Sequence, residues 1–296
     1  MPAYKLTEDF IVSKIDELPT LPTVIYELSR IINDPMSSTN DIEKIMENDI
    51  SITTKVLKLA NSAYYAIPGG VTSLSRAIAY LGFDTVNQLI LSSSIISALE
   101  FEGDTEFDMN DFWKHCIGVG IAAEVIAKEV NHPMPSDLFT SGLVHDMGKI
   151  ALFSMQPDSL LEVKENALDK NLSYIDSEKD LDIFTHTKVG GMLAKKWQLP
   201  PVMLACIEYH HNKIPNARGG ISADLSQSVD IVFLANILIH ALQFGNSGHN
   251  KRAGAPKDLM ERLTIDPTEG FKSLLLKIKN SLGQADEFIR VIGGSQ

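Results

Sequence analysis

The sequence predicts an all-α fold, on three observations. Apolar residues recur at three- and four-residue intervals through most of the chain, which is the spacing of one helical face. No alternating pattern long enough for a useful strand occurs, and no repeat of fixed period is visible. At 296 residues and 44% hydrophobic, the chain is able to bury a sizeable core, and we expect its helices to pack in two layers or subdomains.

The first hundred or so residues form apolar stripes divided by helix-ending signals. One stripe runs from Val24 to Ile32, and another runs from Ile52 to Ala60. Caps and turns need residues that satisfy the unpaired backbone groups at helix ends or that allow the chain to reverse. Signals of this kind are Pro35, the capping-box pair Ser38 and Asp41, the turn Pro68-Gly69-Gly70, the helix C-terminus at Gly82 and the N-cap Asp84.

The rest of the chain is predicted to hold most of the helices. An acidic stretch at 101–110 with Gly103 is typical of a linker, and residues 245–257 (GNSGHNKRAGAPK) are typical of a flexible loop. We therefore expect an N-terminal helical subdomain at 1–103, a second at 104–245 that carries the candidate site, and a C-terminal helical extension at 246–296 packed on the core. The predicted helices are 111–130, 137–155, 158–170, 185–197, 200–211 and 228–244, with short helices after them.

Charge and composition exclude several classes of partner. The net charge of −12, without a local basic patch, argues against nucleic acid and anionic membrane surfaces. No run of about 18 apolar residues is present, and the N-terminus lacks the apolar core of a signal peptide. Cys116 and Cys206 lie in apolar, helix-like stretches and are predicted to be reduced core thiols. Together these features predict a cytoplasmic protein.

Six of the eight histidines fall between residues 115 and 211. Each one alone is more often a core or surface residue. A helical bundle, however, builds a metal site when several helices each present one or two imidazole or carboxylate groups. This donor set suits iron, manganese, nickel, cobalt and zinc alike. The candidate ligands are His115, Asp111 one helical turn before it, the pair His145-Asp146, His186 and the pair His210-His211.

Lys149 lies four residues after His145 and so shares its helix face. A bound metal lowers the pKa of water beside a phosphate ester, and an adjacent lysine offsets charge on the phosphate oxygens. Asp146 and Lys149 are therefore the catalytic candidates. The alternative for Lys149 is a solvated lysine with no role in the site.

Several segments carry a family resemblance. They are Leu18-Pro19-Thr20-Leu21-Pro22, Lys55 to Ser62, Ser73 to Gly82, His145-Asp146-Met147-Gly148-Lys149, and Trp197-Gln198-Leu199-Pro200 with His210-His211. Together they resemble the HDOD family, within the HD superfamily of metal-dependent phosphohydrolases, over about residues 18–245. The resemblance implies an HD-like helical bundle and a signalling or regulatory role, since many HDOD proteins have lost metal ligands. This chain departs from the family's usual Asp-Pro pair, with Asp49-Ile50 in its place.

A partial resemblance to HD-GYP phosphodiesterases implies which of their ligand positions are kept. All the candidate ligands named above match that pattern. The closing aspartate of the pattern falls at Asn236, which offers a carbonyl oxygen but no charge, and Asp230 is a less natural match. The Gly-Tyr-Pro motif is absent, because the chain reads Asn212-Lys213-Ile214-Pro215 after the paired histidines. These differences weigh against hydrolysis of cyclic dinucleotides.

Three functions are consistent with the sequence. The first is a bacterial signal-transduction protein that binds a signalling protein partner or a small phosphorylated ligand and keeps a divalent transition metal in its HD site. The second is an active metal-dependent phosphohydrolase on a nucleotide or another phosphoester. The third is a metal-free interaction scaffold. The metal content of the chain separates the third hypothesis from the first two.

Overall fold

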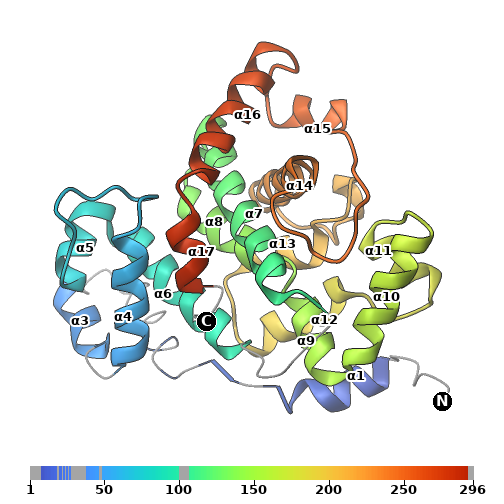
Figure 1. Cartoon of the computed structure of the whole chain (residues 1–296), viewed down its shortest axis with the longest axis horizontal. Coiled ribbons are helices and arrows are strands. Elements are labelled where there is room, and N and C mark those ends of the chain that lie inside the picture. Colours follow the sequence, from blue (N-terminus) through green and yellow to red (C-terminus); the bar gives the residue numbers. More distant parts are fainter. Residues whose placement is uncertain are drawn as a thin grey trace. The chain divides into compact units, whose positions relative to one another are not determined.

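The computed structural model describes residues 8–18, 20, 21, 23, 25, 27, 38–46, 49–99 and 107–292. All regular elements in these ranges are helices, which confirms the all-α prediction (Figure 1). The chain divides into two compact units: unit 1 is Met1–Pro19 with Phe101–Ile278, and unit 2 is Thr20–Glu100 with Lys279–Gln296. The division predicted at 103 and 245 stays a prediction. The predicted boundary at Gly103 and most of the linker lie outside the described residues, and so does most of the stripe that ends at Pro35.

Unit 1 contains the helices that carry the histidines. Its innermost part is α7, which packs along α8 and α14, while α13 packs on α8 and α14 and α12 packs on α9 and α13 (Figure 1). The elements are α1 (Glu8–Ile15), α7 (Met109–Glu129), α8 (Pro135–Val144), α9 (Met147–Met155), α10 (Pro157–Asp169), α11 (Tyr174–Asp180), α12 (His186–Lys196), α13 (Pro201–Tyr209), the 3-10 turn η1 (Pro215–Ala217), α14 (Ala223–Leu242), α15 (Lys257–Arg262) and most of α16 (Glu269–Leu282).

Side-chain caps define where several of these helices begin. The side chain of Asp108 accepts a hydrogen bond from the main-chain N of Asp111 at 2.9 Å at the start of α7. Ser173 and Ser222 cap α11 and α14 in the same way. Such caps satisfy amides that have no partner within the helix. They therefore fix the starts of α7, which carries His115, of α14, which carries Asn236, and of α11.

Two glycines allow α7 and α8 to cross closely. A Cβ atom at Gly120 would lie 2.7 Å from the carbonyl oxygen of Phe139, and one at Gly142 would lie 2.8 Å from that of Val119. Any larger residue would push the helices apart. The crossing brings His115 on α7 to His145 at the end of α8, with ring centroids 5.6 Å apart.

The core of unit 1 agrees with the apolar pattern of the sequence. Trp113 and Trp197 are 5% and 1% exposed. Cys116 and Cys206 are buried free thiols, as predicted. Helix α14 is long and apolar enough to cross a membrane by length and composition, but 67% of its most apolar window is buried inside the protein. A core helix passes the same test, and α14 packs on α7, α8 and α13.

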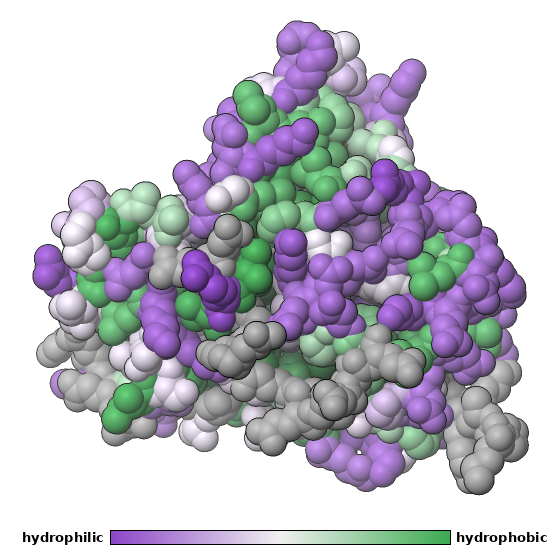
Figure 2. Space-filling model, in the orientation of Figure 1, coloured by the Kyte–Doolittle hydropathy of each residue, from purple (hydrophilic) through white to green (hydrophobic). Residues whose placement is uncertain are grey.

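The outer helices of unit 1 are amphipathic. Helix α10 buries Leu160, Val163 and Ala167, which recur at intervals of three and four residues. The surface over α10 and α11 is largely hydrophilic (Figure 2). Helix α11 was not among the helices predicted from the sequence. It has seven residues, of which Tyr174, Ile175, Ser177 and Glu178 are buried, so it shows no clear apolar stripe.

Unit 2 is a smaller helical bundle of α3 (Thr39–Met46), α4 (Ile50–Ala60), α5 (Leu74–Leu81), α6 (Phe83–Ala98) and α17 (Asp286–Ile292). Asp49 caps α4, and its side chain accepts from the main-chain N of Ile52 at 2.9 Å. The change from Asp-Pro to Asp49-Ile50 therefore leaves the helix start intact. Asn61 ends α4, and its side chain makes two hydrogen bonds to the main chain of Val71 at 2.6 and 2.8 Å.

Most turn and cap predictions in unit 2 agree with the structure, and one is wrong. Ser38 pairs with the carboxylate of Asp41 through its main-chain N and its hydroxyl, at 2.9 and 2.7 Å. Gly82 ends α5 with φ 84°. Asp84 does not cap α6, because the helix begins at Phe83 directly after Gly82 and leaves Asp84 inside the first turn. In the first turn its negative charge interacts favourably with the positive end of the helix dipole, although its side chain makes no capping hydrogen bond.

Candidate metal centre

The chain bends at His145-Asp146, where a single helix was predicted over 137–155. Helix α8 ends at Val144 and α9 begins at Met147, so the two side chains stand between helices. Nδ1 of His145 donates to the carbonyl oxygen of Gly142 at 2.6 Å, which leaves Nε2 as the ring's free lone pair. The break therefore turns a carboxylate and an imidazole into the interior of unit 1.

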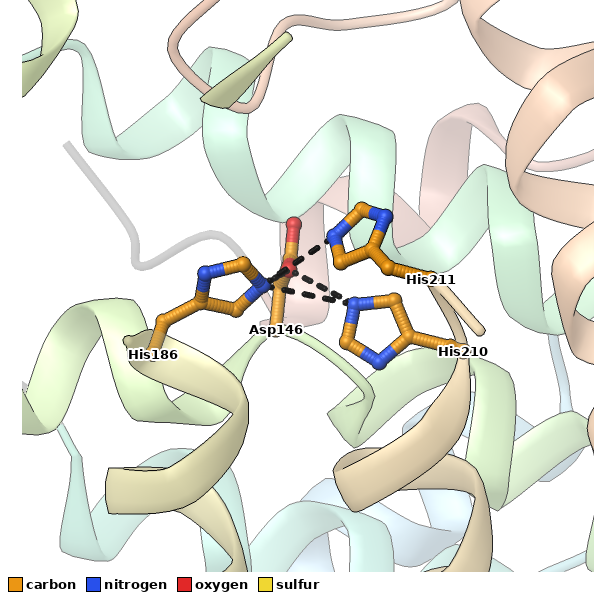
Figure 3. Close-up of side chains that lie close together, drawn as sticks. All are labelled: Asp146, His186, His210 and His211. Carbon is orange, nitrogen blue, oxygen red and sulfur yellow. Dashed lines mark hydrogen bonds and ion pairs between the residues drawn. The ribbon is translucent and has the colours of Figure 1, made fainter. Parts of the chain in front are cut away.

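Ligand group 1 consists of Asp146, His186, His210 and His211. One donor atom of each residue lies within 4.8 Å of those of the others. Oδ1 of Asp146 is 3.2 Å from Nε2 of His186 and 3.5 Å from Nε2 of His210. Nε2 of His186 lies 3.4 Å from Nε2 of His210 and 3.2 Å from Nε2 of His211, and Figure 3 shows the four side chains converging.

These separations match the requirements of a tetrahedral ion. Ligand atoms about 2.0–2.1 Å from a common ion in tetrahedral geometry lie about 3.3 Å from one another. The second ring nitrogens are already used: Nδ1 of His210 donates to the carbonyl oxygens of Cys206 and Ile207, both at 3.1 Å. The remaining Nε2 lone pair faces the other ligands, as metal binding needs.

Ligand group 2 consists of His115, His145 and Asp146, whose donor atoms also lie within 4.8 Å of one another. Oδ2 of Asp146 is 3.3 Å from Nε2 of His145. Asp146 therefore belongs to both groups, with Oδ1 toward group 1 and Oδ2 toward group 2. Neither ring nitrogen of buried His115 makes a hydrogen bond within the described part of the chain. A buried imidazole in that state fits a metal ligand better than a packing residue.

Burial keeps most of the histidines neutral. It lowers the pKa of His210 to about 4 and lowers the pKa of His115 and His211 well below the ordinary value. Burial alone would raise the pKa of Asp146, but His145 and Lys149 beside it lower that pKa well below its usual range. Neutral imidazoles around an ionised carboxylate are the protonation states in which these groups bind a metal.

Glu178 contacts a candidate ligand, and nothing in the sequence pattern predicted this contact. Its side chain is 1% exposed and accepts from the main-chain N and from Nδ1 of His186, each at 2.8 Å. Burial alone would lower the pKa of His186, but Glu178 and Asp146 raise it. A carboxylate behind a metal-binding imidazole fixes its orientation and increases its basicity. Helix α11, which places Glu178 beside His186, was not predicted from the sequence.

Lys149 is buried in the site and does not face solvent. Its Nζ donates to Oδ2 of Asp146 at 2.7 Å and to the carbonyl oxygen of Ser247 at 2.9 Å, and lies 4.3 Å from the centre of the Tyr174 ring. With 1% exposure it is not the solvated lysine of the alternative reading. Its predicted contact with a phosphate remains a prediction.

The segment after α14 lies against the candidate ligands. Gly245 has φ 72°, and a Cβ atom there would lie 2.3 Å from the main-chain N of His115, so only glycine fits. The main-chain N of Asn246 donates to the carbonyl oxygen of Asp111 at 3.0 Å. This region is the loop expected at 245–257, and contacts at Asp111 and Lys149 anchor its first residues.

The last turn of α14 and the loop after it bring two further histidines, His240 and His249, to the site. The ring of His240 lies 4.4 Å from that of His115, and the ring of His249 lies 4.1 Å from that of His240, between centroids. Neither residue could be predicted as part of the site, because no pair spacing links His240 or His249 to the other histidines. Half-buried His240 and buried His249 extend the row of imidazoles beyond ligand group 2.

Two predicted ligands are not brought into either group. Asp111 is half-buried at the start of α7, and its main-chain oxygen is bonded to Asn246. Asn236 is 5% exposed on α14, one turn before His240, and its Oδ1 has no hydrogen-bond partner among the described residues. Their roles as ligands stay predictions. Asp230 is held by Arg218 and Arg262 at 2.6 Å each, so it is a structural ion pair.

Close packing explains why a glycine, Gly148, follows the His145-Asp146 pair. A Cβ atom at Gly148 would lie 1.9 Å from the carbonyl oxygen of His186 and 2.7 Å from the main-chain N of Gly190. Only a glycine lets α9 approach α12 this closely. The approach sets Asp146, before α9, against His186, at the start of α12.

A surface pocket of about 1000 Å³ reaches ligand group 1 through His211. His211 is half-buried, whereas the other three members of the group are buried. Tyr209, Asn212 and Lys213 line the pocket beside it. The pocket therefore gives the candidate ligands a route to small molecules.

The chain is similar to a known protein family over most of its length. The model of the HDOD domain matches residues 18–213. A protein from Treponema pallidum (strain Nichols) that is described as uncharacterized is 24% identical over 272 residues, which is 92% of this chain and 51% of that protein. The chain thus spans about half the length of this relative.

Solved structures share the fold. An HDOD domain protein of unknown function from Geobacter sulfurreducens is 23% identical, with a TM-score of 0.71 over 96% of this chain and 95% of its own. A candidate phosphohydrolase from Shewanella amazonensis SB2B is 22% identical, with a TM-score of 0.70 over 96% and 97%. A candidate signal transduction protein from Marinobacter aquaeolei VT8 is 20% identical, with a TM-score of 0.76 over 97% and 65%.

Proposed function

The chain belongs to the HDOD domain family, and from this premise we propose that it is a bacterial signal-transduction protein that holds a divalent metal ion at ligand groups 1 and 2. The observation that carries the proposal is the position of Asp146, whose two oxygens face the two groups. The name of the Marinobacter aquaeolei structure, a candidate signal transduction protein, supports the signalling role.

The residues fit such an ion by their chemistry as well as by their spacing. Group 1 supplies three imidazoles and one carboxylate, and group 2 supplies two imidazoles and the same carboxylate. Nitrogen and carboxylate donors suit zinc, iron, manganese, nickel and cobalt. When bound, the ion would supply Lewis acidity and an activated water. Glu178 would orient His186, and Lys149 would balance the charge of Asp146.

A second function is a metal-dependent phosphohydrolase. The open pocket beside His211 favours it, because a signalling site that only stored a metal would need no access from solvent. The Shewanella amazonensis SB2B structure is named as a candidate phosphohydrolase, which is consistent with this reading. In this function the polar side chains and lysines of the pocket would hold the phosphoester, and Lys149 would balance the charge of Asp146 behind it.

The partner and the location follow from the signalling role. We expect a signalling protein or a small phosphorylated ligand as the partner, and the cytoplasm as the location. The net charge of −12 continues to disfavour nucleic acid and anionic membranes. Copurification of a bacterial signalling protein with the tag-free chain from its own cells is the corresponding measurement.

Metal content tests the proposal. We would measure transition metals by mass spectrometry on tag-free protein, beside the His145→Ala/Asp146→Ala double variant. His132→Ala is the matched control, since His132 is half-buried in unit 1 but belongs to neither ligand group. We expect bound metal in the unaltered chain and the control and its loss in the double variant. Metal-free protein throughout would favour the metal-free scaffold, and a double variant with full metal content would refute the assigned site.

A further inference from the structure

The pocket beside His211 is positively charged in an otherwise acidic chain. Four lysines and two carboxylates, Asp182 and Glu208, line it, while the chain as a whole carries a charge of −12. Local charge of this sign concentrates anions at a site even on an acidic protein. The lysines are Lys179, Lys188, Lys195 and Lys213, all exposed.

The lysines are spread along the pocket and are not gathered at one point. Lys188 and Lys195 lie two turns apart on α12, which is about 10.5 Å along the helix axis. Lys213 comes from the loop after α13, next to Asn212 and near His211. One phosphate group is too small to contact lysines so far apart. A ligand with two or more anionic groups is large enough.

Neighbouring groups hold two of the lysines in place. Nζ of Lys195 lies 2.5 Å from Oε1 of Glu208, and Glu208 packs where a Cβ atom at Gly191 would be 2.5 Å from its Cγ. Nζ of Lys188 lies 5.0 Å from the centre of the Phe184 ring, a favourable cation–π distance. Lys179 also lies 3.9 Å from Asp176. Among the described residues, neither Lys188 nor Lys213 is paired with a carboxylate, so the charges of these two lysines are available to a ligand.

The start of α12 adds to the attraction for anions. Thr185, Thr187 and Lys188 line the pocket and belong to the first turn of this 11-residue helix or its cap. Helix N-termini favour negative charge through the helix dipole. His186 in the same turn belongs to ligand group 1. The turn therefore joins the charged pocket to the candidate metal centre.

We propose that this pocket binds a phosphorylated small molecule with at least two anionic groups, one beside His211 and Lys213 and another at Lys188. The inference rests on the proposed function for the metal that would face the first group. The lysine contacts themselves do not depend on a metal. The ligand class is therefore a bisphosphate or a longer phosphate ester, in place of a monophosphate.

The test compares two sugar phosphates that bind metals weakly. Calorimetric titration of the full chain as purified would measure the affinity for fructose bisphosphate and for fructose monophosphate. We expect the bisphosphate to bind about tenfold more tightly, which corresponds to about 1.4 kcal/mol of added contacts from the second anionic group. Equal affinities for the two sugar phosphates would overturn the inference without the use of any variant.

Variants identify the residues. The Lys188→Gln/Lys213→Gln double variant should lose roughly tenfold in affinity for the bisphosphate. Lys251→Gln/Lys257→Gln is the matched control, because it removes the same charge from exposed lysines of unit 1 outside the pocket. An equal loss in both double variants, or no loss in the first, would overturn the inference. Circular dichroism melting checks that all chains are folded.

The metal content of the same preparations separates the two proposals. Lysine-dependent binding in a chain without metal would leave the pocket in place and remove the metal-based function. A chain that contains metal but shows no lysine-dependent binding would support the metal-based function and overturn the pocket inference. The lysine variants should keep the metal content of the unaltered chain, because neither lysine belongs to a ligand group.

Discussion

The carboxylate of Glu178 contacts His186 at two points. Oε1 accepts from the main-chain N and Oε2 accepts from Nδ1, both at 2.8 Å. Because both oxygens accept, the ring carries its proton on Nδ1 and turns Nε2 toward Asp146, 3.2 Å away. The orientation of one candidate ligand is therefore set by a residue outside the ligand groups.

Replacing Glu178 by glutamine should weaken metal binding. A glutamine has one accepting oxygen, so its amide nitrogen would face one of the two donors of His186. We expect the metal affinity of the Glu178→Gln variant to fall about 10- to 100-fold, as for other residues behind metal-binding histidines. Competition with a chelating dye measures the affinity.

The control for Glu178 is Glu124→Gln. Glu124 is 6% exposed on α7 and pairs with Lys128 at 2.6 Å, so it matches the burial and charge but lies outside the site. Its metal affinity should stay unchanged. If Glu178→Gln binds metal as tightly as the unaltered chain, Glu178 has only a packing role.

Gly148→Ala should damage both stability and the site. Its Cβ atom would overlap the carbonyl oxygen of His186, at 1.9 Å, and main-chain atoms cannot move aside without shifting α9 from α12. We expect a loss of about 3 kcal/mol in the free energy of unfolding, at the upper end of overpacking, and weaker metal binding. Gly254→Ala is the control, because nothing lies within 4 Å of a Cβ there. Urea denaturation curves that coincide for the two variants would contradict the prediction.

The sequence predicted the fold class and most helices of unit 1 because their apolar stripes are regular. The predicted helices 158–170, 185–197 and 200–211 correspond closely to α10, α12 and α13. The prediction failed where function interrupts the pattern. Apolar spacing continues through the predicted helix at 137–155, but the helix is interrupted at His145-Asp146, where both side chains point inward.

Motif spacing identified some residues of the candidate site, and only the structure showed others. Motif spacing identified Asp146, His186 and the paired histidines, and the structure brings their donor atoms within 4.8 Å. Glu178 and His249 could not be found, since they reach the site through a short helix and an irregular loop. Their contacts are formed by tertiary packing, and neither residue lies at a fixed interval from a ligand.

Arg218 should be essential for the stability of the segment that follows His211. Its fully buried guanidinium donates to the carbonyl oxygen of Asn212 at 2.8 and 3.1 Å and to Oδ1 of Asp230 at 2.6 Å. Arg218→Met would leave buried Asp230 with Arg262 alone. We expect a loss of about 3 kcal/mol in the free energy of unfolding, the lower end of the cost of removing one partner of a buried ion pair, because Arg262 still pairs with Asp230.

Urea denaturation measures the effect of Arg218→Met. Arg252→Met is the matched control, since Arg252 is exposed in the loop after α14. The control should change stability by no more than about 0.5 kcal/mol. Similar small effects of both substitutions would mean that Arg218 does not hold the Asn212 segment.

The stability of the chelator-treated chain should fall as the pH is lowered from about 6.5 toward 4. Burial lowers the pKa of His210 and of His249 from 6.5 to about 4, so below pH 6.5 the unfolded chain binds protons that the folded chain does not. Each such group lowers the free energy of unfolding by up to about 1.4 kcal/mol per pH unit in this window. The contribution is fully present above 6.5 and is lost as the pH falls. His186 acts in the opposite direction, because its raised pKa stabilises the folded chain at low pH and loses this effect as the pH rises through that pKa.

Urea denaturation at pH 7 and pH 5 tests the balance, with His249→Gln as the informative variant. His249 is 6% exposed, and its Nδ1 accepts from the main-chain N of Lys251 at 3.1 Å, a bond that a glutamine oxygen is able to accept as well. The variant removes one titrating group and should show a smaller loss of stability between the two pH values. His132→Gln, at a histidine remote from the site, should retain most of the pH dependence. A pH dependence that is the same in His249→Gln and in the unaltered chain would mean that His249 is protonated equally in the folded and unfolded states, and the buried imidazoles of the site would then have to be open to water.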